Sequence, residues 1–212
     1  SEAVLDIAQE GSNQRRHKSL IAQWQAELHP PKEVDIKDRP FRGTADAPVT
    51  IVAYSDFTCP YCQQGAATME KVLKENQGKI KYVFKHFPLE TTGVARLAAE
   101  YHVAAARQDP ELAWKFYDLL FARRADVLKD GEPAIVNAAK DAGLNMKKLA
   151  ADVKRKDVRA EVDADIAEGQ RIGVQGTPYF LINNLVARGA LSSDLFKEAI
   201  NMALQAAPSG QK

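Results

Sequence analysis

The fold is decided by the stretch Val49-Thr50-Ile51-Val52-Ala53-Tyr54-Ser55-Asp56-Phe57-Thr58-Cys59-Pro60-Tyr61-Cys62, in which an apolar, strand-like run leads into a helix-like segment. The two cysteines at its end are the only ones among 212 residues. A thiol in the first turn of a helix lies near unpaired backbone N–H groups and the positive end of the helix dipole, and both favour the thiolate. We therefore expect Cys59 to be a nucleophile and Cys62 to resolve mixed disulfides formed at Cys59.

The cysteine pair has two other interpretations. A purely structural disulfide would close so short a loop that it would remove little entropy from the unfolded chain. A zinc or copper site would need further ligands, and the four histidines, His17, His29, His86 and His102, are not paired at metal-ligand spacing. We therefore expect no metal ion, and no cofactor other than the redox-active pair Cys59-Cys62 itself.

A second motif, Gly173-Val174-Gln175-Gly176-Thr177-Pro178-Tyr179-Phe180-Leu181-Ile182, predicts a helix end, a turn and then a strand. Proline cannot donate a hydrogen bond to a central strand pair, so Pro178 belongs at the start or edge of that strand. A cis Thr177-Pro178 bond fits a tight connection at this point. An ordinary trans proline that opens a strand fits the sequence as well.

Three segments together resemble the thioredoxin superfamily and, within it, the DsbA-like thiol-disulfide oxidoreductases, which include DsbG-like and ScsC-like proteins. The segments are Asp56–Cys62, Val83–Leu89 and Gly176–Pro178. The likeness begins near Gly43, ends near Ala206 and includes a long helical insertion. It implies an α/β protein with a thioredoxin fold, an inserted helical domain and an N-terminal helical extension.

The expected domains follow this resemblance. Residues 1–42 form the helical extension and its connector, residues 43–90 and 174–212 the thioredoxin-fold domain, and residues 91–173 the inserted helical domain. Strands are expected at residues 49–54, 79–87, 179–182 and 185–188. Helices are expected at residues 60–76, after a Thr92 cap, after Asp109-Pro110, at residues 134–142 and 146–153, around Val158, Val162 and Ile166, and from Ser193 to about Ala206.

The inserted helices are expected to cover the redox motif. Their aromatic residues are interpreted as core rather than as a ligand pocket; they are Trp114, Phe116, Tyr117 and Phe121.

The resemblance also assigns roles to residues. Cys59, Cys62, Thr177 and Pro178 are the expected catalytic residues, and Pro60 and Tyr61 complete the active-site motif. In the family, the residue before the proline lies against the sulfurs, and its backbone pairs with an extended substrate. Substrate binding is therefore expected at Thr177, Pro178 and Tyr179, where the Thr177 hydroxyl is also able to donate a hydrogen bond.

One position departs from the family pattern. Many relatives place a buried carboxylate six residues before the nucleophilic cysteine, where this chain has Ala53. Asp56 is interpreted as a turn or cap residue at the end of the strand. Lys85 is interpreted either as a charge partner beneath the site or as an exposed strand lysine. The sequence therefore predicts no particular proton shuttle.

Composition limits the class of partner. With 29 Lys and Arg against 28 Asp and Glu, the chain gives no reason to expect a nucleic acid or an anionic membrane as partner. No segment approaches the roughly 18 apolar residues of a membrane span, and no signal peptide opens the chain, so an exported protein would already have lost its signal. The family resemblance implies a periplasmic protein. Its partners would be exported polypeptides with thiols or disulfides, and a membrane redox partner that re-oxidises or reduces the site.

Two functional classes remain open. The first is an enzyme that forms disulfides in exported proteins or, as an oligomer, isomerises them. The second is a redox-sensitive chaperone or copper-binding module in which turnover is incidental. The N-terminal stripe Leu20, Ile21, Trp24 and Leu28, which ends at His29-Pro30-Pro31, bears on this choice. We expect it to pack on its own domain, although a homo-oligomer through residues 1–38 is the alternative.

Overall fold

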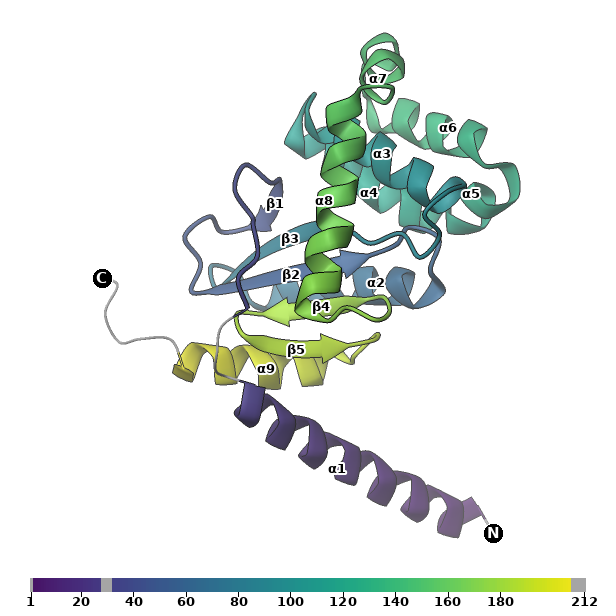
Figure 1. The fold of residues 1–212 in the computed structure, drawn as a ribbon. Helices are drawn as coiled ribbons and strands as arrows, with labels where there is room; N and C mark the ends of the chain where they lie inside the picture. Colours follow the sequence, from purple (N-terminus) through teal and green to yellow (C-terminus); the bar gives the residue numbers. More distant parts are fainter. Residues whose placement is uncertain (1, 28–31, 207–212) are drawn as a thin grey trace.

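The structure, a computed structural model, describes residues 2–27 and 32–206 and contains a five-stranded sheet covered by helices (Figure 1). In chain order the elements are α1 (Glu2–Glu27), β1 (Phe41–Gly43), β2 (Val49–Ser55), α2 (Pro60–Glu75), β3 (Ile80–His86), α3 (Val94–Ala106), α4 (Pro110–Ala122), α5 (Arg124–Asp130), α6 (Glu132–Ala142), α7 (Met146–Asp152), α8 (Lys156–Ile172), β4 (Tyr179–Ile182), β5 (Leu185–Arg188) and α9 (Ser193–Ala206).

The strand order of the sheet is β1-β3-β2-β4-β5. Central strand β2 pairs in parallel with β3, to which α2 connects it, and antiparallel with β4. Strands β4 and β5 form a hairpin that leads into α9, and β1 adds an antiparallel edge next to β3. The βαβ unit followed by ββα confirms the predicted thioredoxin fold.

The two faces of the sheet have different partners. Ile51 and Ala53 belong to the large core that includes the inner sides of α2 and α9. Val52 and Tyr54, which alternate with them along β2, belong to a second core that includes Ile166 of α8. The alternation therefore places the active-site helix on one face of the sheet and α8 on the other.

Helices α3 to α7 gather at one end of the sheet, and α8 runs from them across it (Figure 1). This part follows the long helical pattern expected between the two motifs. Its aromatic side chains are buried in the main core, as predicted; they are Trp114, Phe116, Tyr117 and Phe121. Phe57 is in the loop before Cys59, and the centroid of its ring lies 4.9 Å from that of the Phe121 ring. The helices therefore pack directly behind the redox motif.

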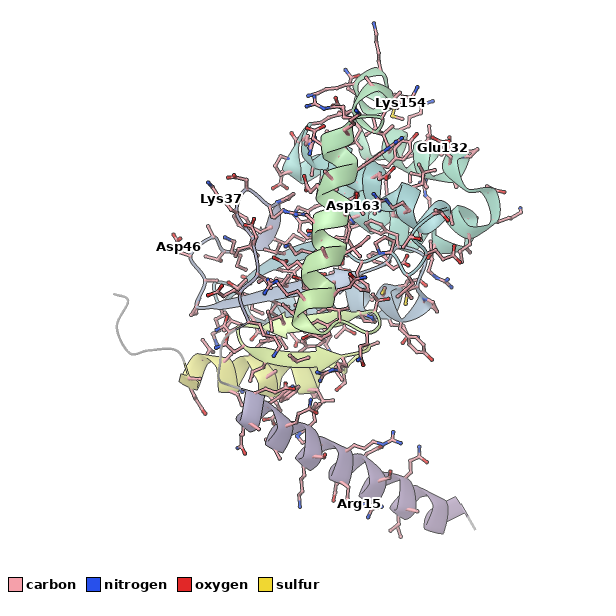
Figure 2. The ribbon with its side chains drawn as sticks, viewed as in Figure 1. Arg15, Lys37, Asp46, Glu132, Lys154 and Asp163 are labelled. Atoms are coloured by element: carbon pink, nitrogen blue, oxygen red, sulfur yellow. The ribbon has the colours of Figure 1, made fainter. Side chains whose placement is uncertain are left out.

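Helix α1 docks on its own chain through its last turns. Trp24 is fully buried and donates a hydrogen bond from Nε1 to the Val186 carbonyl of β5 at 2.7 Å. Leu20 and Ile21 pack against the same core. Leu28 and the predicted helix end His29-Pro30-Pro31 lie outside the described residues. The rest of α1 projects away from the sheet, and Arg15 lies on this projecting part (Figure 2).

Three local expectations need correction. The segment that forms strand β1 is expected to be part of the connector, because three residues are too few to show a periodic pattern. The strand crosses the predicted domain boundary between residues 42 and 43. Helix α5 was not predicted for the same reason of length. The Thr92 cap is wrong: α3 begins at Val94, and its N-cap is Gly93, whose φ of 86° turns the chain and leaves Thr92 outside the helix.

Candidate active site

Cys59 occupies the N-cap position of α2, and Pro60 follows as the first helical residue. Proline suits this position because its missing N–H would have no partner there and its φ is already helical. The Tyr61 side chain is 61% exposed, whereas Cys59 is 8% and Cys62 1% exposed. Both cysteines are free thiols. The first cysteine is therefore the more accessible, although it is more enclosed than a surface thiol.

The surroundings of Cys59 favour its thiolate. A hydrogen bond from the Cys62 thiol is the largest influence and lowers the pKa of Cys59 to about 5, although burial opposes it. Thr177 and the backbone N–H groups of Tyr61 and Cys62 lower this pKa further. These N–H groups are among the unpaired donors at the start of α2, as the sequence argument expected.

The surroundings of Cys62 have the opposite effect. Burial raises the pKa of Cys62 far above its ordinary value, and the neighbouring Cys59 adds to this rise. Ser55, Thr177 and the backbone N–H of Asp56, which donates to Cys62 Sγ at 3.5 Å, offset only part of it. At neutral pH the pair therefore holds one thiolate and one thiol.

The second motif meets the first at Cys59. The Thr177-Pro178 bond is cis, and Cys59 Sγ lies 3.7 Å from the Thr177 carbonyl oxygen, to which the sulfur can donate only while it is protonated. The Thr177 hydroxyl is buried without a hydrogen bond of good geometry, yet it lies close enough to both sulfurs to lower the pKa of each thiol. At Gly65 a Cβ would lie 3.3 Å from Pro178 Cγ, so α2 approaches this loop closely. Tyr179 is only 1% exposed, so its side chain belongs to the core rather than to a substrate surface.

Asp56 ties down the loop before the nucleophile. Its Oδ1 accepts hydrogen bonds from Thr58 N and Thr58 Oγ1, each at 2.7 Å, and its Oδ2 accepts one from Leu89 N at 2.9 Å. The interpretation of Asp56 as a turn residue just after β2 is therefore confirmed. Ala53 leaves the position of the family's carboxylate apolar and buried.

Lys85 is a buried charge partner rather than an exposed lysine. It is 1% exposed and forms ion pairs with Glu168 and, at 3.5 Å, with Asp165, both on α8. Arg39 from the connector binds the same Asp165 through two hydrogen bonds of 2.6 and 3.0 Å. These groups lie on the α8 face of the sheet, opposite α2. The cluster therefore connects α8, β3 and the connector.

The structure brings together two histidines that the sequence separates. His102 Nδ1 and His86 Nε2 lie 3.2 Å apart among the rings behind Phe57. Burial lowers the pKa of His102 to about 3 and that of His86 well below its ordinary value. Within residues 2–27 and 32–206 no group of three or more metal-ligating side chains occurs.

Sequence reasoning missed two polar residues next to the redox motif. Arg124, the first residue of α5, donates from Nη1 to the Thr58 carbonyl at 3.0 Å and from Nε to Gln63 Oε1 at 3.2 Å. Gln63 in turn donates to the Phe121 carbonyl at 2.6 Å. Gln63 directly follows Cys62, and this position was the only local indication that either residue belongs to the site. Arg124 lies on a helix far along the chain.

Comparisons with known proteins agree with this geometry. Residues 35–202 match a family profile described as thioredoxin. The chain is 27% identical over 205 residues to the Na(+)/H(+) antiporter NhaA 3 of Salinispora tropica, and the match covers 96% of the chain but 30% of that protein. It is 27% identical over 176 residues to disulfide bond formation protein D of Bacillus subtilis, covering 80% of the chain and 79% of that protein.

Solved structures agree as well. The crystal structure of oxidised BdbD from Bacillus subtilis matches with a TM-score of 0.72 and 25% identity, covering 82% of this chain and 97% of that one. The family profile spans both the cysteine motif and the cis-proline loop, which the fold brings together. Because it matches well over half of the sequence, the chain belongs to the thioredoxin family, with DsbA-like proteins among its relatives.

Proposed function

We propose that this protein is a thiol-disulfide oxidoreductase that introduces disulfides into exported polypeptides, with Cys59-Cys62 as its redox centre and no other cofactor. The observation that carries the proposal is the unequal pair: the pKa of Cys59 is lowered to about 5, while that of buried Cys62 is raised. A stabilised thiolate favours the reduced form of the site. Its disulfide is therefore a good oxidant.

The reaction proceeds by two thiol-disulfide exchanges. A substrate thiolate attacks Cys59 Sγ of the oxidised pair, the Cys59–Cys62 bond breaks, and Cys62 leaves and takes up a proton. A second substrate thiolate then attacks the substrate sulfur of the mixed disulfide and releases Cys59 as a thiolate. Two electrons pass to the site, and the substrate gains one disulfide. Thr177 and Pro178 hold the substrate backbone beside Cys59.

The proposed location and partners follow the relatives. Similar proteins include disulfide bond formation proteins and a periplasmic thioredoxin-like protein, so we place this chain in the periplasm. No described helix is long and apolar enough to cross a membrane. We expect a membrane redox partner to take the two electrons and to re-oxidise Cys59-Cys62.

An equilibrium with glutathione tests the proposal. The oxidised protein is incubated with mixtures of reduced and oxidised glutathione, and the fraction of free thiol is measured, with Cys59→Ser as the inactive control. We expect a potential well above the value of about −270 mV that is typical of thioredoxin. A value near that of thioredoxin would make the protein a reductase. Absence of Cys59-dependent exchange, with retained client or Cu(I) binding, would favour the chaperone or copper-binding alternative.

An oligomeric disulfide isomerase is the second candidate, because part of α1 stands away from the domain. Ile7 on this part is 70% exposed. The buried end of the helix supports the monomer instead, since Trp24 is already used within the chain. Refolding of a substrate with scrambled disulfides separates the two activities.

A further inference from the structure

Arg124 holds the peptide unit that leads into the nucleophile. Its Nη1 donates to the carbonyl of Thr58, the residue directly before Cys59, at 3.0 Å. Its Nε donates to Gln63 Oε1 at 3.2 Å, one residue after Cys62. One guanidinium therefore contacts the chain on both sides of the cysteine motif.

The other polar atoms of this segment are also occupied. Thr58 N and Oγ1 both donate to Asp56, and Cys59 N donates to the Asp56 carbonyl at 3.2 Å. Gln63 is held by the Phe121 carbonyl at the end of α4. Half-buried Arg124 thus completes a set of hydrogen bonds that joins the start of α2 to the end of α4 and the start of α5.

We propose that Arg124 is a positioning residue of the redox site, which fixes the Thr58–Cys59 peptide and, through its positive charge one peptide unit away, favours the thiolate of Cys59. The inference rests on the proposed thiol-disulfide activity. Arg124 stabilises the Cys59 thiolate in addition to the N–H groups at the start of α2. It belongs to the inserted helices rather than to the thioredoxin-fold domain.

The charge acts in the same direction as the hydrogen bonds already described. A positive charge near a thiolate favours the charged form, and the partial burial of Arg124 weakens the screening by solvent. Cys62, Thr177 and the backbone N–H groups lower the pKa of Cys59 by contact with the sulfur. Arg124 acts without touching the sulfur, so its effect is separable from theirs by mutation.

The test compares Arg124→Gln, Arg124→Lys and Arg123→Gln in the full chain. Glutamine removes the charge but keeps a hydrogen-bond donor, whereas lysine keeps the charge and loses the planar fork. Arg123 is the matched control, because it precedes Arg124 directly and its guanidinium pairs at 2.7 Å with Asp141 of α6 rather than with the cysteine motif. The readouts are the pKa of Cys59, from thiolate absorbance across pH, and the equilibrium constant for reduction of the site disulfide by two glutathione molecules.

We expect Arg124→Gln to raise the pKa of Cys59 by about half a unit or more, and to lower the equilibrium constant about threefold, since one pKa unit corresponds to a factor of ten. Arg124→Lys should stay closer to the wild type, and Arg123→Gln should match it. If Arg124→Gln does not fold, Gln63→Met, which removes the acceptor of Arg124 Nε together with the donor to the Phe121 carbonyl, should shift the pKa in the same direction by less.

Three results would overturn the inference. They are an unchanged pKa in Arg124→Gln (or, where that variant does not fold, in Gln63→Met), an equal shift in Arg123→Gln, and a lysine variant as impaired as the glutamine variant. A wild-type protein that does not exchange with glutathione at all would instead remove the proposed function. The two failures are therefore distinguishable.

Discussion

Cys59 and Cys62 have opposite pKa shifts because their immediate surroundings differ. Both sulfurs lie near Thr177, but Cys59 is at the helix start and Cys62 is one turn inside, where burial dominates. The contact from Cys62 to Cys59 lowers the pKa of the acceptor and raises that of the donor, because the bond exists only while Cys62 keeps its proton.

Replacing Cys62 with alanine or with serine tests this contact. Alanine cannot donate a hydrogen bond, so we expect Cys62→Ala to raise the pKa of Cys59 from about 5 by roughly one unit or more, towards the unperturbed value of about 8.5. Cys62→Ser retains a donor and should keep most of the lowering. The pH dependence of alkylation measures both values. Equal pKa values in the two variants would show that the hydrogen bond is unimportant.

At the residue scale, the sequence predicts only what neighbouring residues determine. The Cys59-Pro60-Tyr61-Cys62 motif is local, and the contact with Thr177 was implied by the family resemblance. The roles of Arg124 and Lys85 do not, because their partners are distant in sequence. A weak signal existed on α8: Asp165 lies on the buried stripe formed with Val158, Val162 and Gly169, and a carboxylate on such a stripe needs a cation.

Among the elements, α8 packs very closely on the sheet. At Gly169 a Cβ would lie 2.7 Å from Phe87 Cδ2 and 3.2 Å from Tyr54 Cδ1. A side chain at position 169 would therefore push α8 away from the sheet. The packing of α8 on the sheet also brings Asp165 and Glu168 to Lys85.

We expect Gly169→Ala to reduce the free energy of unfolding by about 1–3 kcal/mol, as overpacking in a core typically does. Gly11→Ala is the matched control, because Gly11 is also inside a helix but its Cβ would meet only Arg15 Nη1, at 3.7 Å. Alanine is the better helix former, so this control should not destabilise. Urea unfolding measures both. Equal stability of Gly169→Ala and the wild type would mean that α8 shifts without cost.

The contact of β3 with α3 makes stability depend on pH through His86 and His102. Both pKa values are lowered in the folded state, so the unfolded chain binds more protons in acid. The stabilisation is complete above the unfolded pKa of about 6.5 and is lost as the pH falls towards the folded value, about 3 for His102.

We expect the free energy of unfolding to fall by up to about 1.4 kcal/mol per pH unit for each of these histidines below pH 6.5 or so. His102→Gln, which keeps hydrogen-bonding groups but does not titrate, should make this slope shallower. Denaturant unfolding at several pH values measures the slope, and the same slope in His102→Gln would exclude His102 as its source.

The elements themselves were predictable where they were long. Strands β2 to β5 and the helices with a clear apolar face lie close to their expected positions, because each is marked by a local apolar run or stripe. Strand β1 depends on Gly43, whose φ of 92° and lack of a Cβ allow it to lie against the Ile80 carbonyl. Such an approach depends on pairing with β3, which no local pattern records.

For the whole molecule, the position of α1 decides between monomer and oligomer. Only its last turns are in contact with the domain, through Trp24, Leu20 and Ile21, while Arg15 and its neighbours project outward (Figure 2). The described part of the predicted apolar stripe, Leu20, Ile21 and Trp24, is therefore packed within the chain. Among residues 7–19 of α1, the exposed side chains are mostly polar, and Ile7 is the large apolar exception.

We therefore expect the full chain to be a monomer by light scattering. Trp24→Ala removes a fully buried ring and its hydrogen bond to Val186, and should cost about 3–5 kcal/mol of docking and folding stability. If α1 only covers β5 and α9, this variant should release α1 to protease while the potential of Cys59-Cys62 stays the same. An oligomeric wild type that dissociates in Trp24→Ala and loses isomerase activity with it would show instead that α1 assembles the active sites of several chains.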